Sequence, residues 1–397
     1  MTKSANQSLV RETNQKAILE AIYKRGPLSR ANLARMLSIS KPASANNISR
    51  LLDLQVVREI GSKAYSTKSG RQPILVEFNN EFRYIFAIDI SFRETIFAIY
   101  DLAGVVIDNL SVKIATQKSF EAHMINTIKT MLDKNNIPIT KVFCIGISSP
   151  GIFDIESNVP NVHERVKSWF QKDIVAHLSQ KLNIPVFIKN DANMGALGEL
   201  LYGSGKGLTD LMYIFCGEGI GTGVILNSKL QEGARFNVGN ISLYIDRQKL
   251  KSGKTVEEMI CIAGVLETIR LEIGKGSHSC LSAIALNEIS FDDVIMAYQN
   301  KDSLVTSIIR DVAEEISCII LGLASFLGLQ VVIFGGDYLV FKDTIIPLVT
   351  KTFQTYGYSC DIRTAVLGEH AGLHGVFCIA RNQLFDEVCS QTPLIAI

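Results

Sequence analysis

The sequence predicts an α/β protein that carries a small helical domain at its N-terminus. Two strand–turn–strand units, at 84–100 and 212–225, indicate the α/β part, because each pairs apolar runs around a short turn. Residues 1–75 instead show three short helical patterns. A chain of 397 residues with 47% hydrophobic and 20% charged residues is long and apolar enough for two or three packed domains.

Charge is unevenly distributed along the chain. Residues 1–75 hold 13 Lys/Arg and 4 Asp/Glu, a net charge of +9, whereas the remainder holds 27 and 35, a net charge of −8. A basic N-terminal segment on an acidic body predicts that this segment meets a polyanion.

The basic N-terminal domain, which we call the head, is expected to cover 1–80. Its first helix is predicted at about 14–24 and ends at the Gly-Pro pair 26–27. Ser29 is placed to cap a second helix and Ser40 to cap a third. Pro42 fits the start of the third helix, because proline is tolerated in the first turn of a helix.

Two short strands are predicted after the third helix. Val56–Ile60 begins and ends with β-branched residues, Ile74–Val76 is apolar, and a polar, glycine-containing segment joins them. This order of elements is that of a winged helix-turn-helix: two helices, a tight turn, a third helix and a two-stranded wing. In such a domain the third helix enters the major groove of DNA. Gln55 follows that helix where a left-handed residue is common, so it is expected either to adopt positive φ or to mark a different turn.

Polar residues of the third helix and the wing are the predicted DNA contacts. Asparagine can pair with adenine, and lysine and arginine hold phosphates. A basic three-helix unit can also be merely a solvated surface, but the order of elements, the capped third helix and the charge together favour DNA binding. The residues expected to face the DNA are Lys41, Ser44, Asn46, Asn47, Arg50, Lys63 and Arg71.

One apolar stretch is long enough to cross a membrane. Ile316–Gly336 carries no charged residue, but Gly322 and Gly328 interrupt it, and it ends in the β-branched run Val331–Phe334. A buried helix followed by a buried parallel strand explains the stretch better. The polar N-terminus and eight cysteines without a Cys-x-x-Cys pair predict a cytoplasmic protein with free thiols and no signal peptide.

A candidate ligand site follows the strand at 186–188. Asn190 and Asp191 come directly after this strand and precede a helical pattern. An amide beside a carboxylate at the C-terminal end of a strand suits a sugar hydroxyl. The same pair is also an ordinary helix cap, and the residues alone leave both interpretations open.

Taken together, the motifs resemble the ROK family, which groups sugar kinases with sugar-responsive repressors. The resemblance covers nearly the whole chain. The segments that carry it are Ser-Arg-Ala-Asn-Leu-Ala at 29–34, Ser-Lys-Pro at 40–42, Ser-Gly-Arg-Gln-Pro at 69–73, Ile-Asp-Ile at 88–90, Pro-Gly at 150–151, Asn-Asp-Ala-Asn at 190–193, Gly-Glu-Gly-Ile-Gly-Thr-Gly at 217–223 and Val-Val-Ile-Phe-Gly-Gly at 331–336.

The resemblance implies an actin-like, ribonuclease-H-like body of two α/β subdomains around a cleft. The body is expected at 81–397, with subdomain one at about 81–193 plus the C-terminal helix and subdomain two at about 194–370. The head is typical of the repressor branch. That branch implies a homodimer or tetramer that binds an inverted-repeat operator, answers a sugar-like effector and represses carbohydrate-utilisation genes, with no role at a membrane.

Departures from the family pattern argue against phosphoryl transfer. In kinases of the family a Gly-Gly-Thr turn follows Ile-Asp-Ile and holds phosphates, whereas here Ser91-Phe92-Arg93 follows. Glu218 places a carboxylate in the second, glycine-rich turn. Asp191 matches the family's general base, but positioning and charge neutralisation carry phosphoryl transfer, so no kinase activity and no cofactor are expected.

The family's zinc and sugar motifs are also changed. Its Ala-Gly-Glu-Ile-Gly-His motif corresponds to 238–243, where Asn240 replaces the sugar-binding glutamate and Leu243 the zinc-binding histidine. The cysteine cluster is missing, so no structural zinc is expected. Either Glu257 or Glu258 is a candidate to replace the cluster's sugar-contacting glutamate.

The expected ligand contacts are Asn190, Asp191 and Asn240, with no catalytic residue and no metal. The resemblance leaves two other functions open. One is a bifunctional sugar kinase with a DNA-binding head, and the other is a regulator that answers a protein partner through a degenerate sugar site.

Overall fold

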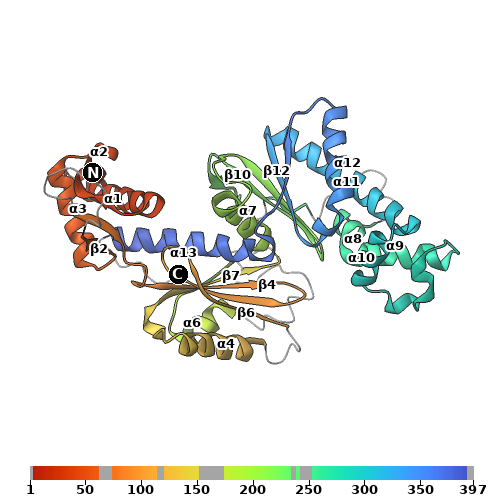
Figure 1. The fold of residues 1–397 in the computed structure, drawn as a ribbon, viewed down its shortest axis with the longest axis horizontal. Coiled ribbons are helices and arrows are strands. Elements are labelled where there is room, and N and C mark those ends of the chain that lie inside the picture. Colours follow the sequence, from red (N-terminus) through yellow and green to blue (C-terminus); the bar gives the residue numbers. More distant parts are fainter. Residues whose placement is uncertain are drawn as a thin grey trace. The chain divides into compact units, whose positions relative to one another are not determined.

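The computed structural model describes residues 3–61, 74–113, 120–151, 174–233, 238–241 and 253–390. The chain divides into two compact units (Figure 1). Unit 1 comprises Met1–Ile147, Ser168–Ile188 and Val376–Ile397, and unit 2 comprises Ser148–Lys167 and Lys189–Gly375. Among the predicted residues, Lys63, Arg71 and Leu243 lie outside the described ranges.

The head contains the three predicted helices, α1 (Lys3–Arg25), α2 (Arg30–Met36) and α3 (Lys41–Asp53). Both predicted caps are confirmed. Ser29 Oγ accepts a hydrogen bond from Asn32 N at 3.1 Å, and Ser40 Oγ accepts one from Ala43 N at 3.3 Å. Helix α1 begins before the predicted residue 14, in a polar stretch that has no apolar period from which sequence analysis would identify it.

A three-stranded sheet completes the head, in the order β1 (Leu28–Ser29), β3 (Leu75–Phe78), β2 (Val57–Ile60). The antiparallel pair β2–β3 confirms the predicted wing strands, and β1 adds a third strand that was not predicted. Gln55 has φ 61°, which confirms the left-handed alternative, and its carbonyl accepts a hydrogen bond from Asn79 Nδ2 at 2.8 Å.

The head packs on the last helix of the chain, α13 (Ala371–Cys389), within unit 1. Phe385 of α13 stacks on Phe78 with ring centroids 5.4 Å apart, and Tyr23 of α1 meets Phe78 edge-on at 6.2 Å. The guanidinium of Arg381 lies 4.2 Å above the Tyr23 ring. The contacts of Phe385 and Arg381 join segments that are more than 300 residues apart, so α13 is part of the head's own support.

Unit 1 continues with a five-stranded sheet. Helix α13 covers one face, and α4 (Phe120–Lys134) and α6 (Ile174–Leu182) cover the other (Figure 1). The antiparallel pairing of β4 with β5 confirms the strand–turn–strand unit predicted at 84–100. The strand order is β6 (Val106–Val112), β5 (Thr95–Tyr100), β4 (Tyr84–Ile90), β7 (Val142–Ser149), β8 (Val186–Asn190).

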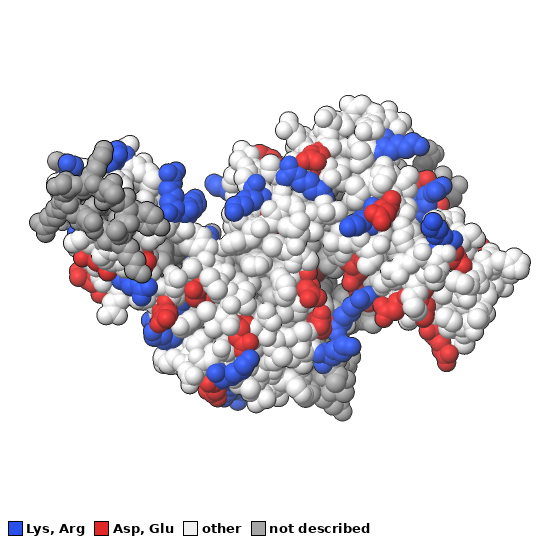
Figure 2. Space-filling view, viewed as in Figure 1, with Lys and Arg blue, Asp and Glu red and all other residues white. Residues whose placement is uncertain are grey.

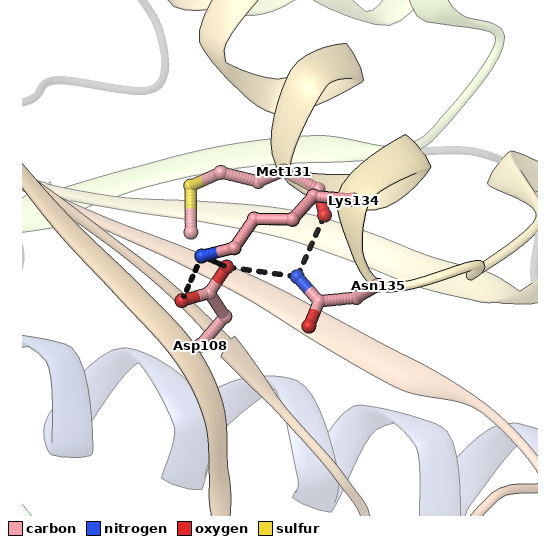
Figure 3. A network of polar contacts seen from close by, with 4 residues as sticks. All are labelled: Asp108, Met131, Lys134 and Asn135. Atoms are coloured by element: carbon pink, nitrogen blue, oxygen red, sulfur yellow. Dashed lines mark hydrogen bonds and ion pairs between the residues drawn. The ribbon is translucent and has the colours of Figure 1, made fainter.

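A polar network fastens strand β6, at the edge of the sheet, to helix α4 (Figure 3). Lys134 Nζ donates to both carboxylate oxygens of Asp108 at 2.9 and 3.1 Å, and Asn135 Nδ2 bridges Asp108 and the Met131 carbonyl. The hydrogen bond from Lys134 holds the pKa of Asp108 below its ordinary value. The network therefore anchors a strand whose residues are largely exposed.

The sheet of unit 2 has the same strand order as that of unit 1. Its order is β11 (Lys229–Leu230), β10 (Ile220–Leu226), β9 (Leu211–Cys216), β12 (Val331–Gly335), β13 (Asp361–Thr364). Strands β9 and β10 confirm the unit predicted at 212–225. Two sheets of equal order are what the actin-like prediction requires.

Alternate residues of β9 face different helices. Met212 and Ile214 pack in the core with α11 (Ser303–Leu327) and α12 (Lys342–Thr355), whereas Tyr213 packs with α7 (Asp191–Tyr202). Helices α8 (Val256–Ile260), α9 (Ile262–Gly274) and α10 (Phe291–Gln299) complete the unit.

The apolar stretch 316–336 is the second half of α11 followed by the buried strand β12, which is parallel to both β9 and β13, as predicted. The helix itself is buried on one side only, since Ile316, Ile320 and Ala324 are buried whereas Phe326 is 87% exposed. None of the helices that the structure describes has the length and apolarity needed to cross a bilayer.

Candidate functional site

The predicted DNA-reading helix α3 presents only part of the expected set to solvent. Lys41 and Asn46 are exposed and Arg50 is half-buried. The prediction that Ser44 and Asn47 face outward is wrong, since they are 1% and 5% exposed. Ser44 Oγ donates to the Arg30 carbonyl and Asn47 Nδ2 donates to the Ala43 carbonyl, so both satisfy backbone acceptors instead.

Sequence analysis missed Ser49, which is exposed one helical turn beyond Asn46. Its hydroxyl accepts a hydrogen bond from Arg30 Nη1 at 3.4 Å, and Arg30 also pairs with Glu59 at 2.8 Å. The spacing i, i+3 from Asn46 is the signal that identifies it.

Several cations of the head are paired locally. Arg30 pairs with Glu59 and Arg58 pairs with Glu77. Over the face of the whole molecule that Figure 2 draws, basic and acidic side chains are interspersed. Within the described ranges, Lys41 takes part in no ion pair. Of the two cations of α3, Lys41 is exposed and Arg50 is half-buried, so Lys41 is the better placed to meet a phosphate.

The candidate ligand site lies where β8 ends and α7 begins. Asn190 caps α7, because its Oδ1 accepts from Asn193 N at 3.0 Å. Its Nδ2 donates to the Gly151 carbonyl at 2.9 Å and to Asp191 Oδ1 at 3.0 Å. Ala192 N donates to the same Asp191 oxygen at 2.7 Å. Since these bonds use Oδ1, Oδ2 of Asp191 is the oxygen that can accept from a ligand hydroxyl.

The environment of Asp191 disfavours its charged form. Burial raises the pKa of Asp191 to about 6, the amide of Ala192 opposes the shift, and the nearby charge of Glu257 adds to it. Carboxyl groups with raised pKa values are more common at functional sites than elsewhere, which makes Asp191 a candidate ligand contact.

Glu257, not Glu258, faces this site. Glu258 completes a capping box at the start of α8, where its carboxylate accepts from Thr255 N at 2.6 Å. Glu257 Oε1 instead accepts from Ile220 N at 3.3 Å, at the end of the glycine-rich turn. Of the two candidates, Glu257 is therefore the one whose side chain extends toward the glycine-rich turn.

The glycine-rich turn 217–219 is lined by carboxylates of the chain itself. A Cβ at Gly219 would lie 2.8 Å from Glu257 Oε1, and a Cβ at Gly217 would collide with Asp337 Oδ2. The turn is also closed internally, because Gly217 N donates to the Gly219 carbonyl at 3.0 Å. Sequence analysis missed Asp337, which follows the Gly335-Gly336 pair directly and so lies at the end of β12.

The turn between β4 and β5 is closed in a different way. Ser91 Oγ accepts from Arg93 N at 3.3 Å and from Glu94 N at 3.2 Å, and donates to the Glu94 carbonyl at 2.9 Å. Amide groups that a phosphate-binding turn would direct at its ligand are thus engaged by the serine hydroxyl.

Asn240 lies beside strand β10. Both N and Oγ1 of Thr222 donate to the carbonyl of the preceding Gly239, at 3.0 and 2.9 Å. These two bonds fix the backbone just before Asn240. Among the described residues no group of three or more His, Cys, Asp or Glu side chains is arranged to hold a metal ion.

The head has the order of elements of a winged helix-turn-helix, and two five-stranded sheets of equal strand order follow it in the chain. This combination is typical of a transcriptional regulator with an actin-like body. The chain belongs to the ROK family, whose model matches residues 85–383. The head precedes the matched region.

Known relatives share both parts. The chain is 31% identical to the xylose repressor of Bacillus subtilis (strain 168) over 408 residues, which cover 97% of this chain and 99% of the repressor. It is 20% identical to the DNA-binding transcriptional dual regulator NagC of Escherichia coli (strain K12), over 97% of this chain and 96% of NagC.

Among solved structures, a ROK family transcriptional regulator described as a homolog of the E. coli MLC protein superposes with a TM-score of 0.79 at 18% identity. The match covers 96% of this chain and 98% of that regulator. At such identity the match shows the fold alone.

Proposed function

We propose that this protein is a sequence-specific transcriptional regulator that represses carbohydrate-utilisation genes under the control of a sugar-like effector. The observation that carries the proposal is the alignment with a xylose repressor over 97% of this chain and 99% of the repressor. The capped helices and wing strands of the head support it. A protein with this role works in the cytoplasm, where its DNA is.

In this proposal the exposed side of α3 reads DNA through Lys41, Asn46 and Arg50, and Lys63 and Arg71 hold phosphates from the wing. A symmetric dimer presents two such helices, so the operator is an inverted repeat with half-sites about one helical turn apart or a multiple of it. The dimer or tetramer is part of the proposal.

We further propose that the body is a sensor and not a kinase. Asn190, Asp191 and Asn240 hold the sugar, while the engaged amides of the 91–94 turn and the carboxylates at the 217–219 turn oppose phosphate binding. Phosphoryl transfer depends on positioned and neutralised phosphates, so Asp191 acts as a hydrogen-bond acceptor here and not as a catalytic base.

Helix α13 provides the connection between sensor and head. Its first turns pack on α7, where a Cβ at Gly198 would collide with the Ala371 carbonyl and one at Gly375 with the Met194 carbonyl. Its later residues, including Phe385, support the head. A ligand bound at the start of α7 can therefore bias the head, by as much as it prefers one arrangement over the other.

The test measures binding of the purified protein to DNA from its own upstream region, by fluorescence anisotropy, with and without a panel of monosaccharides. We expect one sugar to change operator affinity. Asp191→Ala should keep operator binding and lose the response to that sugar, whereas the exposed control Asp292→Ala should keep both.

If no sugar at millimolar concentration changes operator affinity or melting temperature, sensing by a small ligand is excluded and control by a protein partner replaces it. ATP-dependent sugar phosphorylation that disappears in Asp191→Asn would show that the protein is an enzyme.

A further inference from the structure

The carboxylates at the glycine-rich turn 217–219 bear on the charge of the ligand. Its amide environment suits an anion, yet the anions that approach it belong to the protein. Glu257 reaches Ile220 N at 3.3 Å, and the Asp337 carboxylate lies where a Cβ at Gly217 would be. The glycines thus make room for these two side chains.

Glu257 is held in this position by its own helix. The capping box of Thr255 and Glu258 fixes the first turn of α8, and Cys261 N closes on the Glu257 carbonyl at 3.0 Å. The backbone of Glu257 is therefore fixed on both sides, and its side chain extends from a rigid turn toward β10.

The Glu257 carboxylate also acts electrostatically on Asp191 in the ligand site. Glu257 is the charged neighbour that adds to the raised pKa of Asp191, so the two carboxyl groups share one electrostatic environment. Burial raises the pKa of the neighbouring Tyr338, and the charges of Asp337 and Glu218 add smaller contributions. Lys189, next to Asn190 in the chain, pairs with Glu232 at 2.9 Å, so its charge is balanced locally.

We propose that the site at the start of α7 accepts sugars that carry no negative charge and rejects phosphorylated sugars. The assignment rests on the proposed function, since it names the class of effector for that site. A phosphate that displaced the Glu257 carboxylate from Ile220 N would lie at a turn that Asp337 also lines, in the electrostatic range of Asp191. Neutral hydroxyls and ammonium groups are instead attracted to carboxylates.

The experiment compares matched ligand pairs by isothermal titration calorimetry on the full-length protein. The pairs are glucose with glucose 6-phosphate and glucosamine with glucosamine 6-phosphate, and xylose and inorganic phosphate complete the set. We expect at least one uncharged or cationic sugar to bind, and its phosphorylated partner to bind at least about tenfold more weakly.

Two variants locate the cause of the discrimination. Glu257→Gln keeps an acceptor for Ile220 N and removes the charge, so the ratio of the two affinities should shrink by roughly tenfold. Glu258→Gln changes a neighbouring exposed carboxylate to a residue that still completes a capping box, and should leave the ratio unchanged. Asp337→Asn provides a second variant if Glu257→Gln does not fold, and should reduce the ratio as well.

The outcomes separate this assignment from the function on which it rests. Tighter binding of a phosphorylated sugar than of its unphosphorylated partner overturns the assignment and leaves a sugar-controlled regulator intact. Absence of binding by every sugar, with operator binding retained, overturns both the assignment and the sensing part of the proposed function. An unchanged ratio in both Glu257→Gln and Asp337→Asn overturns the role of these carboxylates.

Discussion

At the scale of single residues, Asp191 shows a conflict between stability and the proposed function. Its pKa is raised to about 6 in the folded chain, chiefly by burial. Between the ordinary carboxyl pKa near 4 and about 6, the folded chain keeps a proton that the unfolded chain has released. The free energy of unfolding therefore falls as the pH rises through this window and stays lower above it.

Asp191→Asn should remove this cost, because an amide oxygen can still accept from Ala192 N. We expect the free energy of unfolding to rise at pH 7.5 by on the order of 1–3 kcal/mol and to change little at pH 4, measured by urea unfolding. Asp210→Asn is the control, and it should lower the free energy of unfolding at pH 7.5. Hydrogen bonds from Thr209 and Asn227 lower the pKa of Asp210, so its charged form stabilises the folded chain. Equal effects of both substitutions would contradict this account of Asp191.

Gln55 offers a second test at the residue scale. Its φ of 61° is unfavourable for a residue with a Cβ, and its side chain is exposed. Gln55→Gly should raise the free energy of unfolding by about 0.5–1 kcal/mol. The same substitution in a regular helix, Gln354→Gly in α12, should lower it by a similar amount. Destabilisation by Gln55→Gly would show that the side chain makes a stabilising contact.

At the scale of elements, local signals in the sequence predicted much of the fold. They did not predict contacts between segments that are distant in the chain. Ser29 and Ser40 were identifiable as caps because a cap bonds to a residue three positions away. The apolar run to Phe334 identified a helix and a buried strand, but not the exposed side of that helix. Ser44 and Asn47 share one face of α3 with the buried Ile48 and Leu51, at the spacing i, i+3, i+4, i+7. Helical periodicity therefore predicts their burial, and only the polar character of their side chains argued against it.

The same distinction explains the residues that were missed at the site. Asn190 and Asp191 stood out as neighbours in one motif. Asp337 approaches Gly217 from 120 positions further along the chain, and only the fold brings these residues together. The support of the head by α13 is likewise a contact between the two ends of the sequence.

Phe385 tests that support. It is 2% exposed and its ring stacks on Phe78. Phe385→Ala should lower the free energy of unfolding by about 3–5 kcal/mol in the transition that includes the head, and should weaken operator binding although Phe385 lies outside α3. Phe326→Ala, at a side chain that is 87% exposed, should change stability by less than about 0.5 kcal/mol. Calorimetry and anisotropy measure the two effects, and full operator affinity in Phe385→Ala would contradict the supporting role.

At the scale of the whole molecule, the distribution of charge predicts how operator binding responds to salt. The net charge of +9 in residues 1–75 contrasts with −8 in the rest. Each phosphate contact releases counterions, so operator affinity should fall steeply between about 50 and 200 mM salt. In a plot of log affinity against log salt, Lys41→Ala should reduce the slope by about 1, whereas the buried Ser44→Ala should not change it. Equal slopes for the two variants would remove Lys41 from the interface.

The equal strand order of the two sheets places the 91–94 turn and the 217–219 turn at corresponding positions, each after the central strand of its sheet. The amides of one are engaged by a serine hydroxyl, and the other is approached by carboxylates from distant segments. No single substitution would remove the groups that occupy both turns. Opening both turns to an anion would take changes in separate parts of the chain, since Ser91 occupies one turn and Glu257 and Asp337 approach the other.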